Sequence, residues 1–129
     1  YYKVFAADVI RRDTKKLYAK DAFFKDGYKE VKGVEAIETY FLATAEAIVS
    51  CTFDITDVSV RDGNYYFRWV MNLTIKRDRD NPMEQIGMSH VRFAPDGKVV
   101  FHADYWDTSI VFERAPVIGS IIRWAKEQF

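Results

Sequence analysis

An alternation of apolar and mostly polar side chains over residues 65–75 predicts a fold built on a sheet. The odd positions of this segment are all apolar: Tyr65, Phe67, Trp69, Met71, Leu73 and Ile75. The even positions are mostly polar and include Arg68, Asn72 and Thr74. Because successive side chains of a strand point to opposite faces, the pattern predicts one long strand whose odd face lies in the core.

Other segments share this period of two and are separated by turn residues. They lie at about 51–60, 84–93 and 98–107, with turns at 61–64 and 94–97 and a charged loop at 76–82. The second half of the chain is therefore predicted to be an antiparallel meander. A shorter hairpin is expected at 22–31, around the turn dipeptide Asp26-Gly27.

Apolar residues at helical spacing predict helices before and after the meander. The strongest pattern runs from Val34 to Val49. A first helix is expected from Tyr1 to about Arg12, followed by a short helix that ends at Tyr18. A last helix is expected at 117–129, with an apolar stripe that should dock on this chain or on another.

Together these elements predict an α+β fold, with helices covering one face of the sheet, in a single domain over residues 1–129. No linker or internal repeat marks a boundary. The 10 Phe, eight Tyr and three Trp are more large rings than the outer surface of such a sheet needs, so some should line a pocket or a dimer face.

Charge and composition exclude several classes of partner. The 19 basic and 19 acidic side chains cancel, so no nucleic-acid partner is expected. No apolar run approaches the roughly 20 residues of a membrane span, and membrane contact is not expected. The single cysteine, Cys51, fits a cytoplasmic location, with any segment removed before Tyr1 left open. Two histidines among scattered carboxylates form no metal signature, and we expect neither metal nor cofactor.

Two stretches resemble the SnoaL-like branch of the nuclear transport factor 2-like superfamily. They are residues 17–26 (LYAKDAFFKD), with Gly33 and Tyr40-Phe41 following, and residues 91–107, from Val91-Arg92-Phe93 to Asp104-Tyr105-Trp106-Asp107. The resemblance implies a cone-shaped roll, in which helices cover the concave face of a strongly curved antiparallel sheet, and a homodimer formed through the outer sheet face. The superfamily includes ketosteroid isomerases, polyketide cyclases and binding modules, so it implies a pocket rather than one reaction.

The resemblance to ketosteroid isomerases implies catalytic roles for Asp26 and Tyr2. Asp26 matches the carboxylate that shuttles a proton, although Gly27 stands where proline is usual. Tyr2 matches, by counting without gaps, the tyrosine that hydrogen-bonds the enolate oxygen. Ser89 stands at the second donor to that oxygen, an aspartate in those enzymes. The residues alone favour turn chemistry over catalysis for Asp26 before Gly27.

The resemblance to polyketide cyclases implies that Asp104 is a general acid/base and that Trp106 lines the pocket. His102 lies two residues before Asp104, so both point to the same face of a strand and form a candidate His–Asp pair. Periodicity alone places this face outside. A three-residue turn before the strand would keep it there, whereas a four-residue turn would bring Ser89 beside the pair.

Two hypotheses for function follow. The first is a cofactor-independent isomerase or cyclase that transfers a proton on a hydrophobic carbonyl substrate. The second is a non-catalytic module that binds a small hydrophobic or aromatic ligand, or that dimerises. The candidate catalytic residues are Asp26, Asp104, His102 and Tyr2. The candidate ligand-binding residues are Ser89, Trp106, Trp69, Phe24 and Tyr40.

Overall fold

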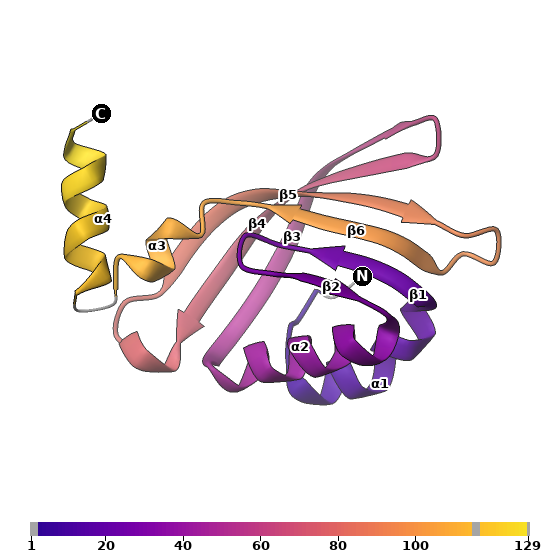
Figure 1. Ribbon diagram of the computed structural model, residues 1–129, viewed down its shortest axis with the longest axis horizontal. Coiled ribbons are helices and arrows are strands. Elements are labelled where there is room, and N and C mark those ends of the chain that lie inside the picture. Colours follow the sequence, from indigo (N-terminus) through magenta and orange to yellow (C-terminus); the bar gives the residue numbers. More distant parts are fainter. Residues whose placement is uncertain (1–2, 115–116, 129) are drawn as a thin grey trace.

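A curved six-stranded sheet with two long helices against its concave face forms the frame of the protein (Figure 1). The computed structural model describes residues 3–114 and 117–128. The strands are β1 (Tyr18–Lys25), β2 (Glu30–Lys32), β3 (Ile48–Arg61), β4 (Asn64–Ile75), β5 (Met83–Phe93) and β6 (Val99–Tyr105). The helices are α1 (Ala7–Leu17), α2 (Val34–Glu46), α3 (Ser109–Phe112) and α4 (Ile118–Glu127), with a 3₁₀ turn, η1, at Lys76–Asp78.

The sheet order is β2-β1-β6-β5-β4-β3, and neighbouring strands pair antiparallel except for β1 and β6, which are parallel. The predicted α+β fold and the antiparallel meander β3 to β6 are confirmed. The parallel pair joins the first strand to the last, and so brings residues 18–25 beside residues 99–103.

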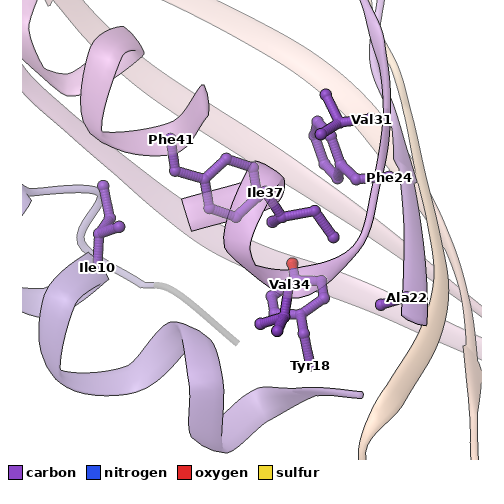
Figure 2. Packing of buried hydrophobic residues seen from close by; sticks show 8 residues of the cluster. All are labelled: Ile10, Tyr18, Ala22, Phe24, Val31, Val34, Ile37 and Phe41. Carbon is purple, nitrogen blue, oxygen red and sulfur yellow. The ribbon is translucent and has the colours of Figure 1, made fainter. Parts of the chain in front are cut away.

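The inner face of the sheet carries the odd residues of β4, as the alternation predicts. Trp69, Met71, Leu73 and Ile75 are buried and pack with Cys51 and Met83. A second cluster lies where α1 and α2 meet β1 and β2; its buried members are Ile10, Tyr18, Ala22, Phe24, Val31, Val34, Ile37 and Phe41 (Figure 2). Between them, the two clusters provide the walls of a cavity.

The N-terminal helix begins later than its apolar pattern predicts. Residues 3–5 are extended along β3: Phe5 N–H donates to Cys51 C=O (2.9 Å), and Phe53 N–H donates to Lys3 C=O (2.8 Å). The predicted helix from Tyr1 is therefore wrong over these residues, because pairing with β3 satisfies backbone groups that a helix would otherwise use. The predicted second short helix is also wrong, since α1 continues to Leu17 and Tyr18 begins β1.

The register between β5 and β6 places Ser89 opposite Asp104 and Val91 opposite His102. The pairing steps from Phe93↔Val99 to Arg92↔Phe101, which leaves Val100 as an extra residue on β6. This β-bulge, rather than a four-residue turn, brings the odd positions of β5 beside the even positions of β6. His102 and Asp104 consequently face the interior and not the polar outer surface.

The C-terminal helix α4 stands away from the sheet (Figure 1). Its apolar residues Ile118, Ile121 and Trp124 are more than half exposed, whereas Gly119 on the opposite side lies against the Glu113 backbone. The expected docking partner of this stripe is therefore not another described part of the chain. No helix among residues 3–114 and 117–128 is long and apolar enough to span a bilayer.

Candidate functional site

A cavity of about 420 Å³ lies between the inner face of the sheet and helix α2. Its walls are mainly aromatic and aliphatic; the rings include Phe5, Tyr18, Phe24, Phe41, Phe53 and Trp69. Asp26, His102 and Asp104 are its titratable polar groups besides tyrosine and cysteine, and no lysine or arginine lines it in the described part of the chain. Such a volume and lining suit a small apolar ligand with few polar groups.

A hydrogen-bonded row of three side chains crosses one wall of the cavity. The Tyr18 hydroxyl lies 2.7 Å from Nδ1 of His102, and Nε2 of the same ring lies 2.7 Å from Oδ1 of Asp104. Oδ1 of Asp104 accepts a hydrogen bond from Nε2–H, so Nδ1 of a neutral His102 accepts a hydrogen bond from the Tyr18 O–H. This arrangement fixes the orientation of the imidazole ring and of the carboxylate.

Asp104 is held from its other side by Ser89. The Ser89 hydroxyl donates to Oδ1 of Asp104 (2.5 Å) and accepts from the indole N–H of Trp69 (2.8 Å). Because indole N–H is only a donor, the single hydroxyl proton of Ser89 points at the carboxylate. Ser89 is fully buried behind Asp104, so its hydroxyl donates to another residue of the protein and not to a ligand.

Asp26 occupies the turn between β1 and β2 and uses both carboxylate oxygens there. Its Oδ1 accepts from the backbone N–H groups of Tyr28 (2.8 Å) and Lys29 (2.9 Å). Its Oδ2 accepts from the hydroxyl of Tyr40 (2.7 Å). Turn chemistry thus accounts for Asp26, even though the side chain also lines the cavity.

Two tyrosines beside Asp26 stay protonated over a wide pH range. Burial raises the pKa of Tyr28 to about 12, and the charge of Asp26 acts in the same direction. Burial, followed by the hydrogen bond to Asp26, raises the pKa of Tyr40 still further. Both phenols are therefore neutral hydrogen-bonding groups near neutral pH.

Most candidate residues meet at this one cavity. Seven of them line it: Asp26, Asp104, His102, Trp106, Trp69, Phe24 and Tyr40. Ser89 lies behind the wall, bonded to Asp104 and Trp69. Tyr2 lies outside the described residues. Asp26 and Asp104 line the same cavity but have different hydrogen-bond partners.

Sequence reasoning missed Tyr18, which the structure places on the wall next to His102. Tyr18 is the first residue of β1 and almost fully buried. Its position within the stretch that resembles the SnoaL-like branch was a usable signal, but its contact with His102 depends on the parallel β1–β6 pairing. No group of three or more His, Cys, Asp or Glu side chains arranged to hold a metal occurs among the described residues.

A family model described as the SnoaL-like domain matches residues 1–102. A search among curated proteins gave no significant match. The solved structures compared below share the fold of this chain but are distant from it in sequence. Their similarity therefore bears on the fold alone.

Three of these structures are representative. A nuclear transport factor 2-like protein of unknown function from Burkholderia pseudomallei K96243 is 12% identical, with a TM-score of 0.72 over 88% of this chain and 93% of that one. A hypothetical protein with a ketosteroid isomerase-like fold from Catenulispora acidiphila, in complex with trimethylamine, is 20% identical, with a TM-score of 0.69 over 78% and 77%. A candidate SnoaL-like polyketide cyclase from Jannaschia sp. CCS1 is 15% identical, with a TM-score of 0.69 over 85% and 79%.

Proposed function

The chain belongs to the SnoaL-like domain family, and we propose on this premise that it binds a small hydrophobic carbonyl compound in the cavity and transfers a proton on it without a cofactor. The observation that carries the proposal is the row Tyr18–His102–Asp104, which presents an oriented carboxylate to an apolar space. A positioned acid/base group in a largely apolar pocket is the minimum that such chemistry requires.

Asp104 is the acid/base in this proposal. Two donors hold its Oδ1, and its side chain is about one-fifth exposed, so the second oxygen can take a proton from the ligand and return it. Asp26 is less suited to this role, because three hydrogen bonds already occupy both of its oxygens. We assign to Asp26 the positioning of Tyr40, and we keep Tyr2 as a candidate donor to the ligand oxygen.

Isotope exchange tests the proposal without knowledge of the natural substrate. A panel of hydrophobic ketones is incubated with the protein in D₂O, and NMR follows deuterium entering the carbon next to the carbonyl. Exchange faster than in buffer is expected with wild type and is expected to fall by about 10²-fold or more with Asp104→Asn. Exchange that is equally fast with both proteins would exclude Asp104 as the base.

Non-catalytic binding is the second candidate function. The hydrogen bonds of the polar wall favour it, because Ser89, His102 and Asp26 all form hydrogen bonds to other residues of the protein. A chain that binds hydrophobic ketones but gives no exchange above buffer would have this function. The trimethylamine complex of the Catenulispora protein supports a small-ligand role for the fold.

We further propose a cytoplasmic homodimer, in which each chain is a single domain over residues 1–129. The outer sheet face supports the dimer, because it exposes large apolar residues from β5 and β6: Ile86, Met88 and Tyr105. Exposed apolar surface of this kind is typical of an interface. Sedimentation velocity at several protein concentrations tests this proposal.

A further inference from the structure

The hydrogen-bond donors around Asp104 already donate to acceptors of the protein. The Trp69 N–H donates to Ser89, and the Ser89 hydroxyl donates to Oδ1 of Asp104. Nε2 of His102 donates to the same oxygen. None of these three hydrogens is therefore directed at a ligand.

Asp104 nevertheless keeps one oxygen for the cavity. Both hydrogen bonds that the carboxylate accepts end on Oδ1. Oδ2 accepts no hydrogen bond from residues 3–114 or 117–128, and the side chain lines the cavity. Oδ2 of Asp104 is therefore a hydrogen-bond acceptor for a ligand in the cavity.

The character of this acceptor does not depend on the protonation state of His102. In the neutral ring Nδ1 accepts from Tyr18, and in the charged ring it donates to the Tyr18 oxygen; Nε2 carries a proton toward Asp104 in both. The Ser89 hydroxyl donates to the same oxygen (2.5 Å), so Oδ1 receives two hydrogen bonds whatever the charge of His102. An ionised carboxylate held by two donors can only accept.

We propose that the ligand of this cavity carries an enolic or phenolic hydroxyl that donates to Oδ2 of Asp104. This inference rests on the proposed function and names its substrate class. A carbonyl oxygen placed at this point would face a carboxylate oxygen, and two acceptors side by side without a proton repel each other. A hydroxyl supplies the missing proton, while its apolar body meets the rings of Phe24 and Trp69.

The proton transfer then begins on oxygen. The O–H bond of the enol breaks, a bond forms between that proton and Oδ2, and the electron pair stays on the ligand as an enolate. The protonated Asp104 returns the proton to the enolate carbon, which completes an enol-to-ketone isomerisation with no other reactant. His102 and Ser89 stay bonded to Oδ1 and stabilise the carboxylate at the start and end of the cycle.

Three probes that share a naphthalene ring system, substituted at the same position, separate donor from acceptor ligands: 2-naphthol, 2-methoxynaphthalene and 2-acetylnaphthalene. Their dissociation constants are measured by NMR titration of the isotope-labelled protein. Wild type is expected to bind 2-naphthol about tenfold or more tightly than either of the others, the usual effect of a hydrogen bond to a charged group. Equal or tighter binding of the acetyl or methoxy compound by wild type would overturn the inference.

Asp104→Asn provides the second arm, because the amide can donate as well as accept. The preference for 2-naphthol over 2-acetylnaphthalene is expected to shrink toward unity in this variant and to persist in Asp54→Asn, a matched change on exposed β3. A preference that survives in Asp104→Asn would also count against the inference. The wild-type ranking decides the question if this variant does not fold.

Binding and isotope exchange can fail separately. A strong 2-naphthol preference without exchange of ketones would leave the hydroxyl site in place and remove the catalytic proposal. Exchange of ketones by a protein that binds the ketone probe more tightly than 2-naphthol would support the catalytic proposal and overturn the hydroxyl site.

Discussion

The Tyr18 hydroxyl lies 2.7 Å from Nδ1 of His102, although the two residues are 84 positions apart in the chain. The parallel pairing of β1 with β6 brings them together, and their rings lie nearly parallel with centroids 6.0 Å apart. Both side chains are buried, so the contact links the helix-covered cluster of Figure 2 to the polar wall of the cavity.

Tyr18→Phe is expected to lower the free energy of unfolding by about 1–3 kcal/mol, because a buried ring nitrogen loses its hydrogen-bonding partner. Urea unfolding measures the loss. Nitrogen NMR of the imidazole is expected to show a changed Nδ1 resonance and a retained bond from Nε2 to Asp104. Tyr105→Phe, which removes an exposed hydroxyl, is the control. An unchanged His102 spectrum in Tyr18→Phe would contradict the assigned contact.

Ser89→Ala is expected to destabilise the fold by about 1–3 kcal/mol and to weaken the hold on Asp104. The change leaves the buried Trp69 N–H without its acceptor and removes one of the two donors to the carboxylate. Urea unfolding and the indole N–H resonance of Trp69 report the two effects. Ser59→Ala, at an exposed position on β3, should alter neither. A stable Ser89→Ala protein with an unmoved Trp69 signal would show that the bond is absent.

The free energy of unfolding is expected to fall as pH rises from about 10 to about 12. Unfolded tyrosines lose their protons near pH 10, whereas burial raises the pKa of Tyr28 to about 12 and that of Tyr40 further. Above pH 10 the unfolded state therefore holds fewer protons than the folded state, and stability declines with pH. Cys51, with a pKa raised by burial to about 12, acts in the same direction from a lower pH.

Urea unfolding at pH 8, 10 and 11 checks this trend in wild type and in Tyr40→Phe. The variant is expected to be less stable at pH 8, because its hydrogen bond to Asp26 is lost, and to show a shallower decline above pH 10. An equally steep decline in both proteins would remove Tyr40 as a source of the effect.

Ile121→Ser and Trp124→Ser are expected to change the free energy of unfolding by no more than about 0.5 kcal/mol. Both side chains are more than half exposed on α4 and contribute little to the core. Ile10→Ala in α1, at a fully buried position, is the comparison and should cost about 2–5 kcal/mol. A loss in the α4 variants that grows with protein concentration would reveal a partner copy on this stripe.

The framework of the fold could be predicted from local patterns, because burial repeats with the period of each element. The odd positions of β4 and the apolar face of α2 are examples. The extended residues 3–5 could not be predicted, since their backbone partners belong to β3, far along the chain. The apolar stripe of α4 was predicted, but what covers it was left open, because periodicity identifies an apolar face and not its partner.

Most of the residues that line the cavity's polar wall could be named from the sequence, but Tyr18 and the hydrogen bonds among these residues could not. Asp104, His102 and Ser89 could be named from the chain, yet their facing depends on the bulge at Val100, which alternation does not encode. Asp26 and Asp104 look alike in sequence. Their difference arises from neighbours that only the folded chain provides: backbone N–H groups and Tyr40 for Asp26, and Ser89 and His102 for Asp104.

The carboxyl carbon of Asp104, observed by carbon-detected NMR during a titration with 2-naphthol, tests the account most directly. We predict that this resonance moves with the ligand concentration, that the Asp26 carboxyl moves less, and that Asp104→Asn weakens binding. An Asp104 resonance that stays fixed while the ligand saturates the cavity, or a response confined to Asp26, would contradict the assignment of Asp104 as the group that meets the ligand.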